Sequence, residues 1–207
     1  MAYPIARHIV KLIYWPWLKE IKGLENIPKD KPFIIAANHS SYFDIMLPHL
    51  CIIKTIDTHI LTFVNASYWK IPLVGAFLDW AGGIPVYVRH ENGAKKKNME
   101  SFKKALDYLK KGGAILIFPE GTRSDDGKLK KAHTGIAKLA IKSKAPILPF
   151  GIIDAHRVLP KGAMLPRFRR AAIKIGKLIN VEKETEENAT RKIMKEIAKL
   201  INQKYNY

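Results

Sequence analysis

Short apolar runs alternate with longer segments of helical periodicity along most of this chain. The predicted strands cover residues 33–37, 59–64, 84–88, 114–118 and 146–152, and a β-rich segment covers 171–181. One predicted helix begins near residue 44, and short helices are predicted between 67 and 81. Longer helices are predicted at 95–111, 134–143 and 184–204. Strands separated by helices are typical of an α/β fold, so we expect a single domain with a largely parallel central sheet flanked by helices.

The sequence predicts one domain over residues 21–207, because no repeat, low-complexity tract or long linker divides this range. Residues 1–20 are assigned to an amphipathic helix that precedes this domain. Its apolar face carries Ile5, Ile9, Leu12 and Ile13, its opposite face carries Arg7 and Lys11, and Tyr14, Trp15 and Trp17 follow around Pro16. An apolar face with a cationic flank and a Trp/Tyr edge suits a membrane interface. A helix packed on the protein's own core is the alternative.

The chain carries a large excess of positive charge. Thirty-six Lys and Arg against 18 Asp and Glu leave a formal net charge of +18, which favours a polyanionic partner, either nucleic acid or anionic lipid headgroups. No zinc-finger spacing, RNP-like run or basic zipper is present. No run reaches the roughly 18 uncharged apolar residues that a spanning helix needs. The single cysteine, Cys51, lies in an apolar run and is expected to be a buried thiol.

The first candidate for chemistry is the pair His39 and Asp44, which follows the predicted strand 33–37. Histidine titrates near neutral pH and can accept a proton from a hydroxyl, while a carboxylate on its second ring nitrogen fixes the tautomer. On a straight helix, residues five apart point about 140° away from each other, so the backbone must bend for the two to meet. A loop histidine with Asp44 as a helix N-cap is the alternative.

The second candidate is the run Phe-Pro-Glu-Gly-Thr-Arg-Ser at residues 118–124, which follows the predicted strand 114–118. Ligands of open α/β sheets bind at the carboxyl ends of the strands, where these residues fall. Arg123 offers a planar guanidinium that suits a phosphate group. Taken alone, such a run is also typical of a surface turn.

Together the two runs, NHxxxxD and about 75 residues later FPEGTRS, resemble the glycerolipid acyltransferase family of the 1-acylglycerol-3-phosphate acyltransferase type. Residues 82–89, Gly-Gly-Ile-Pro-Val-Tyr-Val-Arg, look like the family's second block, which ends in a basic residue. Residues 145–150 look like its fourth block. The resemblance covers about residues 23–176.

One position departs from the pattern of this family. Its members often carry a lysine shortly after the strand predicted here at 59–64. This chain has Asn65 and Ala66 there, with Lys70 a few residues further on.

The resemblance implies transfer of a fatty acyl group from a thioester, acyl-CoA or acyl-carrier protein, to the hydroxyl of 1-acylglycerol-3-phosphate, giving phosphatidic acid. His39 is the expected general base and Asp44 its orienting carboxylate. The expected acceptor-binding residues are Arg89, Glu120, Gly121, Thr122 and Arg123, with the two arginines on the acceptor phosphate. Asn38 and Ser40 are expected to brace the turn. No cofactor and no metal are implied, because the acyl donor is a co-substrate.

Two rival functions remain open from the sequence. One is acylation of another lysophospholipid or of an aminolipid, and the other is a non-catalytic basic module that binds membranes or nucleic acid. The paired motifs argue against the second, because charge attraction alone requires neither of them. We therefore expect no nucleic-acid partner. We expect a peripheral or monotopic protein on the cytoplasmic face of a membrane, with anionic lipid and a lysophospholipid as its partners.

Overall fold

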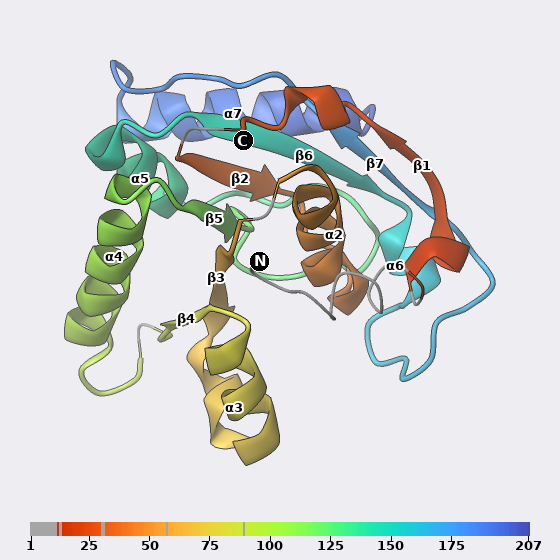
Figure 1. The fold of residues 1–207 in the computed structure, drawn as a ribbon, viewed down its shortest axis with the longest axis horizontal. Coiled ribbons are helices and arrows are strands. Elements are labelled where there is room, and N and C mark those ends of the chain that lie inside the picture. The colour runs from red at the N-terminus through yellow and green to blue at the C-terminus, as the bar shows by residue number, and fades with distance from the viewer. Residues whose placement is uncertain (1–11, 13, 30–31, 57, 89) are drawn as a thin grey trace.

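The computed structural model describes residues 12, 14–29, 32–56, 58–88 and 90–207. Within these ranges, seven strands form one sheet in the order β1-β7-β6-β2-β5-β3-β4 (Figure 1). The strands are β1 (Leu18–Lys22), β2 (Phe33–Ala37), β3 (Ile60–Asn65), β4 (Gly83–Val86), β5 (Ala114–Ile117), β6 (Ile147–Ile153) and β7 (Ala171–Ile175). Neighbouring strands are parallel except β6 and β7. The predicted α/β fold with a largely parallel sheet is confirmed.

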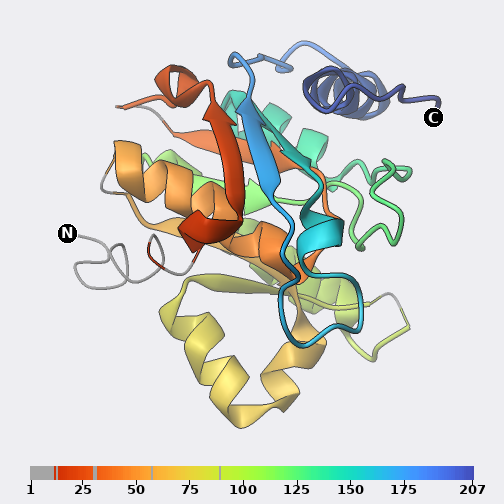
Figure 2. The same cartoon turned by 90° about the vertical axis from the view of Figure 1, so that its right-hand side faces the viewer.

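Helices cover both faces of the sheet (Figures 1 and 2). One face packs against α4 (Ala94–Lys110), α5 (Gly135–Ser143) and α7 (Glu186–Leu200), and the other against α2 (Met46–Thr55) and the short α6 (Ala155–Val158). Helix α3 (Pro72–Trp80) follows β3 and stands away from the rest at the lower edge of the view in Figure 1.

The central strand β2 is buried on both faces, as parallel strands in such folds are. Ile34 and Ala36 belong to the core under α4, α5 and α7, whereas the alternate residues Phe33 and Ile35 belong to the core under α2. The period-2 alternation thus divides one short apolar run between two cores. Cys51 is buried in the second core, in agreement with its prediction.

The start of the domain differs from the sequence prediction. Leu18–Lys22 forms β1 and pairs in parallel with β7, so residues 18–20 of the predicted N-terminal helix lie in the sheet. The 3₁₀ turn η1 (Trp15–Trp17), which contains Pro16, precedes this strand. Most of the predicted helix, residues 1–11 and 13, lies outside the described residues. In the part of the chain that the structure describes, no helix has both the length and the apolar character needed to cross a bilayer.

Candidate active site

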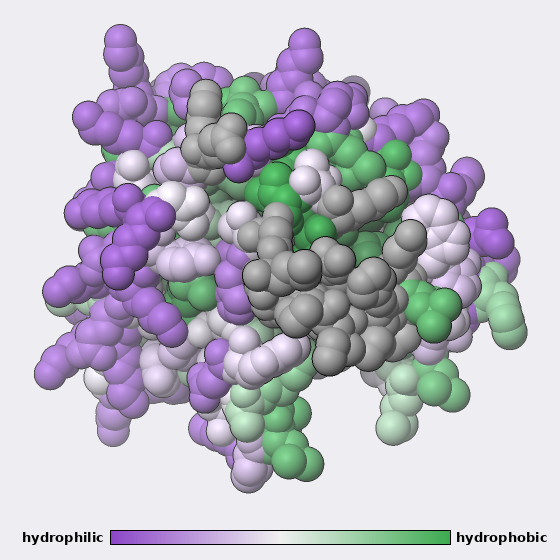
Figure 3. Space-filling view, viewed as in Figure 1, coloured by the Kyte–Doolittle hydropathy of each residue, from purple (hydrophilic) through white to green (hydrophobic). Residues whose placement is uncertain are grey.

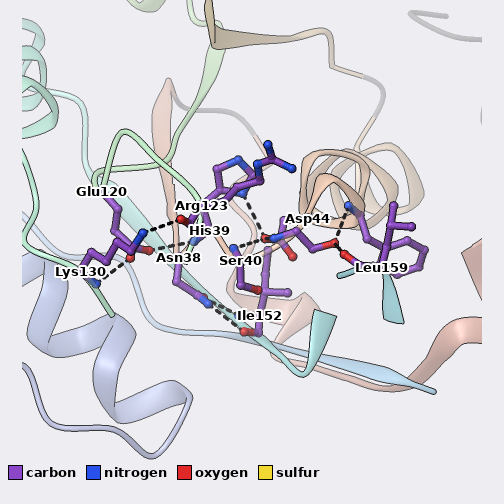
Figure 4. A network of polar contacts seen from close by, with 11 residues as sticks. Asn38, His39, Ser40, Asp44, Glu120, Arg123, Lys130, Ile152 and Leu159 are labelled. Carbon is purple, nitrogen blue, oxygen red and sulfur yellow. Dashed lines mark hydrogen bonds and ion pairs between the residues drawn. The ribbon is translucent and has the colours of Figure 1, made fainter. Parts of the chain in front are cut away.

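The site lies where β2, β5 and β6 reach the same edge of the sheet. These three strands are adjacent and parallel, so their carboxyl ends bring together residues 38–44, 118–124 and 152 (Figure 4). The sequence prediction that both motifs follow strands is confirmed. What the sequence does not show is how the segments are fastened to each other.

Asn38 fastens the end of β2 to β6. Its side-chain amide donates to the carbonyl of Ile152 over 2.8 Å and accepts from the N–H of Ile152 over 2.7 Å. The side chain therefore continues the hydrogen-bond ladder that the main chain leaves at this point. This frees the backbone to turn, and it agrees with the expected bracing role of Asn38.

His39 and Asp44 contact each other directly. Nδ1 of His39 lies 3.1 Å from Oδ2 of Asp44, whose side chain is 0% exposed. The same carboxylate oxygen accepts from the backbone N–H groups of Ser40 at 2.5 Å and Ser41 at 2.7 Å. The other oxygen, Oδ1, is buried without a hydrogen-bond partner among the described residues. The Asp44 carboxylate is thus held by the turn that it helps to close.

The bend between His39 and Asp44 comes from an extended residue followed by a 3₁₀ helix. Ser41 is extended and caps η3 (Tyr42–Ile45), with its hydroxyl accepting from the N–H of Phe43. Asp44 sits at the third position of η3 and reaches back to the N–H of Ser41, which completes a capping box. The alternative that Asp44 is the N-cap is therefore wrong, because Ser41 fills that position.

The ring of His39 is partly open to solvent. It stacks on Phe118, with ring centroids 4.1 Å apart and an interplanar angle of 21°, and its side chain is 14% exposed. Because Nδ1 faces Asp44, Nε2 is the nitrogen left for a substrate, and it makes no hydrogen bond with the described residues. The arrangement matches a general base whose tautomer is set by a carboxylate.

Glu120 lies behind His39 and binds backbone. Its Oε1 accepts from the N–H of His39 at 2.8 Å and its Oε2 accepts from the N–H of Lys130 at 2.7 Å. Ser124 adds a second link, because its N–H donates to the carbonyl of His39 over 2.8 Å. We expected Glu120 to bind the acceptor, but its contacts are those of a brace that ties the 118–130 loop to the turn between His39 and Asp44.

Burial raises the pKa of Glu120 from 4.5 to about 7, because the loss of water outweighs the two backbone hydrogen bonds that favour the charged form. At low pH the carboxyl is protonated in both the folded and unfolded chain. As the pH rises from 4.5 to 7, the unfolded chain ionises first and gains stability. The contribution of Glu120 to the free energy of unfolding therefore falls across this window and stays low above it.

Glu120→Gln should remove this pH dependence. The free energy of unfolding of the native protein minus that of the variant should fall by about 3 kcal/mol between pH 4.5 and pH 7. The variant also loses one acceptor, but that cost is independent of pH. Urea denaturation of both proteins across the window measures the difference. A constant difference would show that the two N–H donors keep Glu120 ionised throughout.

The two residues after Glu120 have different environments. Gly121 has a φ of +66°, and a Cβ there would come within 2.9 Å of Cδ2 of His133, so the turn requires glycine. Thr122 is exposed, and no hydrogen bond from its side chain to the described residues is formed. Its expected contact with the acceptor stays a prediction.

Arg123 is held from several sides but keeps one free nitrogen. Its guanidinium carbon lies 3.5 Å from the centroid of the Tyr42 ring, and its carbonyl accepts from Nζ of Lys130 over 2.7 Å. The Tyr42 hydroxyl in turn lies 2.8 Å from that of Tyr68. One guanidinium nitrogen, Nη1, is buried with no hydrogen-bond partner among the described residues. An oriented cation with an unused donor is suited to an anionic group.

Arg123 and His39 lie next to one another in Figure 4. Ser124, the residue after Arg123, donates to the carbonyl of His39, and Arg123 stacks on Tyr42, so the two motifs meet at the same part of the sheet edge. Arg89, the second predicted phosphate contact, lies outside the described residues. Asn65, where the family often has lysine, caps η4 (Ala66–Lys70) by accepting from the N–H of Ser67, while Lys70 is exposed at its end.

Sequence reasoning missed Tyr42 and Lys130. Tyr42 lies inside the first motif and could have been noticed as an aromatic partner for an arginine. Lys130 stands among several other lysines, and nothing local distinguishes it. In the part of the chain that the structure describes, no group of three His, Cys, Asp or Glu side chains is placed to hold a metal ion.

Comparison with known proteins gives a consistent result. A family model described as Acyltransferase matches residues 19–153. A 1-acyl-sn-glycerol-3-phosphate acyltransferase of Borreliella burgdorferi is 31% identical over 206 residues, covering 96% of this chain and 78% of that protein. A chloroplastic enzyme of the same name from Brassica napus is 27% identical over 161 residues, covering 77% of this chain and 44% of that protein.

A solved structure is also similar over most of the chain. The crystal structure of the 1-acyl-sn-glycerophosphate (LPA) acyltransferase PlsC from Thermotoga maritima superposes with a TM-score of 0.73 at 26% identity, covering 95% of this chain and 77% of that one. The chain spans less than half the length of the Brassica napus protein.

Proposed function

Because the chain belongs to the acyltransferase family, we propose that it transfers a fatty acyl group from a thioester to the hydroxyl of 1-acylglycerol-3-phosphate, giving phosphatidic acid. The observation that carries this proposal is the contact of His39 with the buried Asp44 beside the unused donor of Arg123. The similarity to enzymes named for this reaction supports it.

The proposed reaction needs no protein nucleophile. Nε2 of His39 takes the proton of the acceptor hydroxyl as that oxygen attacks the thioester carbonyl. The tetrahedral intermediate then expels the thiolate, which takes the proton back from the imidazolium, so an ester and a free thiol are formed. Asp44 orients the ring and stabilises its protonated form, and such positioned proton transfer contributes about 10²–10⁴-fold.

The acceptor is assigned by its charge. Arg123 would bind the phosphate monoester of the lysolipid with its planar guanidinium, which is stacked on Tyr42. Arg89, the last residue of the run 82–89, is the second candidate for this phosphate. Thr122 is exposed on the same loop and could donate to the glycerol or phosphate oxygens.

The test is release of free thiol by the purified protein with a panel of acceptors that share one acyl chain. Lysophosphatidic acid should support release from acyl-CoA or acyl-carrier protein, and phosphatidic acid should be the product. Release only with a lysophosphodiester or an aminolipid would mean that the protein acylates another lysophospholipid or an aminolipid. No release with any acceptor and either donor would favour a non-catalytic basic module.

We also propose that the protein acts at the cytoplasmic face of a membrane as a peripheral or monotopic protein. The net charge of +18 supports attraction to anionic lipid, and the amphipathic sequence pattern of residues 5–13 supports apolar insertion. Charge attraction weakens with salt, whereas apolar burial does not. The two contributions can therefore be separated.

Deleting residues 1–11 should lower the fraction of vesicle binding that persists at high salt. The deletion stops there because Tyr14, Trp17 and Leu18 pack against the core under α2. Acylation of a bilayer-embedded acceptor should slow more than acylation of a soluble short-chain acceptor. Liposome flotation of both proteins at low and high salt, with and without anionic lipid, gives the measurement. Coinciding salt curves would mean that other residues bind the membrane.

A further inference from the structure

A surface loop at residues 160–170, between α6 and β7, exposes large apolar side chains among arginines. Met164 is 95% exposed, Leu165 is 79% exposed and Phe168 is 100% exposed. Arg167, Arg169 and Arg170 are exposed beside them. At the lower right edge of Figure 3, where Figure 1 places this loop, apolar side chains stand out from the surface. These exposures exclude packing of the three apolar side chains on the core.

The base of the loop is fastened although its tip is exposed. The N–H of Arg167 donates to the carbonyl of Val158 over 2.7 Å, and Nε1 of Trp17 donates to the carbonyl of Arg167 over 3.1 Å. The N–H of Ala163 donates to the carbonyl of Pro160 over 3.0 Å. Hydrogen bonds to α6 and to η1 thus hold the main chain of this loop, so the apolar tip is presented from a fixed base.

A cavity of about 610 Å³ lies beside the base of this loop. Its lining residues are Asp125, His156, Arg157, Pro160, Arg167, Phe168 and Arg169. The one carboxylate among them, on Asp125, is paired with Lys161 at 3.1 Å. Among the ion pairs of the described residues, none involves Arg167 or Arg169. The cavity is therefore positively charged and suits an anionic group.

The cavity also borders the loop that carries the candidate site. Asp125 follows Arg123 by two residues, and Gly127 lies directly against His156, because a Cβ on that glycine would come within 2.4 Å of the ring. A ligand in the cavity would thus lie next to the loop that is hydrogen-bonded to His39.

We propose that residues 160–170 are a docking element for an anionic membrane. Met164, Leu165 and Phe168 enter the apolar part of the interface, and Arg167 and Arg169 hold the phosphate of an anionic lipid headgroup at the cavity. A nucleic acid or a soluble polyanion would use the arginines but not the apolar tip. Arginines beside apolar side chains fit a lipid surface, which offers both kinds of contact.

A second exposed apolar surface supports this orientation. Leu73 and Phe77 on α3 are exposed, and Figure 3 shows apolar side chains at the lower edge where Figure 1 places that helix. The loop at 160–170 and α3 therefore occupy the same edge of the molecule in this view. A flat bilayer could touch both at once.

The experiment is flotation with vesicles of phosphatidylcholine alone and of phosphatidylcholine mixed with phosphatidylglycerol. The variant Arg167→Ala/Arg169→Ala should bind the mixed vesicles about 30-fold more weakly, about 1 kcal/mol per arginine, and the neutral vesicles as well as before. Lys103→Ala/Lys104→Ala is the matched control, since it removes the same charge from exposed positions on α4. Its binding should change much less. No turnover is required, so the result does not depend on the proposed reaction.

The apolar tip needs its own variant. Phe168→Asp should weaken binding to both kinds of vesicle about 10-fold or more, whereas Met99→Asp, at an exposed apolar position on α4, should change only the charge-dependent part. Circular dichroism should show the same fold for all variants. The proposal fails if the arginine pair matters no more than the lysine pair, or if Phe168→Asp behaves like Met99→Asp.

One other occupant of the cavity can be tested directly. The phosphates of CoA offer the same anionic chemistry as a lipid headgroup, so titration calorimetry with free CoA should give equal affinities for the native protein and Arg167→Ala/Arg169→Ala. A loss of CoA affinity with unchanged vesicle binding would assign the cavity to the acyl donor and overturn the proposal.

Discussion

His39→Ala should lose almost all acyl transfer while the protein stays folded. The ring is the only group in the described turn that is placed to accept a proton and is held by a buried carboxylate. Without it the acceptor hydroxyl must lose its proton to water, which should lower kcat by about 10²–10⁴-fold. Release of free thiol measures the rate. Circular dichroism checks the fold, and a folded variant with near-native turnover would refute the proposed mechanism.

Asp44→Asn should also slow acyl transfer, but by less than His39→Ala. Asparagine keeps the shape of the side chain and one oxygen for the N–H groups of Ser40 and Ser41, so the turn should survive. It loses the charge that stabilises the protonated ring of His39. We therefore expect a smaller loss of kcat than for His39→Ala. Thermal unfolding should be measured as well, because Asp44 also completes the capping box of η3.

Much of this fold could be predicted because local pattern and global structure agree. The run 33–37 was predicted to be a buried strand from its apolar residues alone, and β2 has those bounds. The edge strand β1 was missed because its apolar and charged residues do not form a buried run, and its burial depends on β7, about 150 residues away. The antiparallel direction of β7 against β6 depends on the path of the segment 154–170 that joins them, which the pattern of apolar residues does not show.

In the candidate site, too, some contacts could be predicted from the sequence and others could not. The contact between His39 and Asp44 could be anticipated, since the two are close in sequence and the strand-to-helix turn supplies the bend. The bracing role of Glu120 could not, because a carboxylate in a polar loop suggests a ligand contact equally well. Only the folded chain shows that both oxygens bind backbone N–H groups of two separate loops. These contacts hold the turn between His39 and Asp44 and the loop that carries Arg123 in one arrangement.

That arrangement gives Arg123 a defined position, so we expect its replacement to weaken binding of the acceptor. The guanidinium is stacked on Tyr42, so its direction is fixed before an acceptor binds. Arg123→Lys would keep the charge but lose the planar donor set and the stacking. It should therefore recover only part of the function that Arg123→Ala loses. Tyr42→Phe, which keeps the ring and removes only the hydroxyl, is the matched control for the stack.

Arg123→Ala should raise the KM for lysophosphatidic acid by about 10–150-fold, which corresponds to the roughly 1.5–3 kcal/mol of a charged hydrogen bond. The KM for the acyl donor should stay near its native value, because the lost contact is to the acceptor phosphate. Arg89→Ala should act in the same direction with an equal or smaller effect. Initial rates measured against each substrate in turn separate the two constants. If only the donor KM rises, these arginines bind the phosphates of CoA instead, and the acceptor phosphate must be held by other residues.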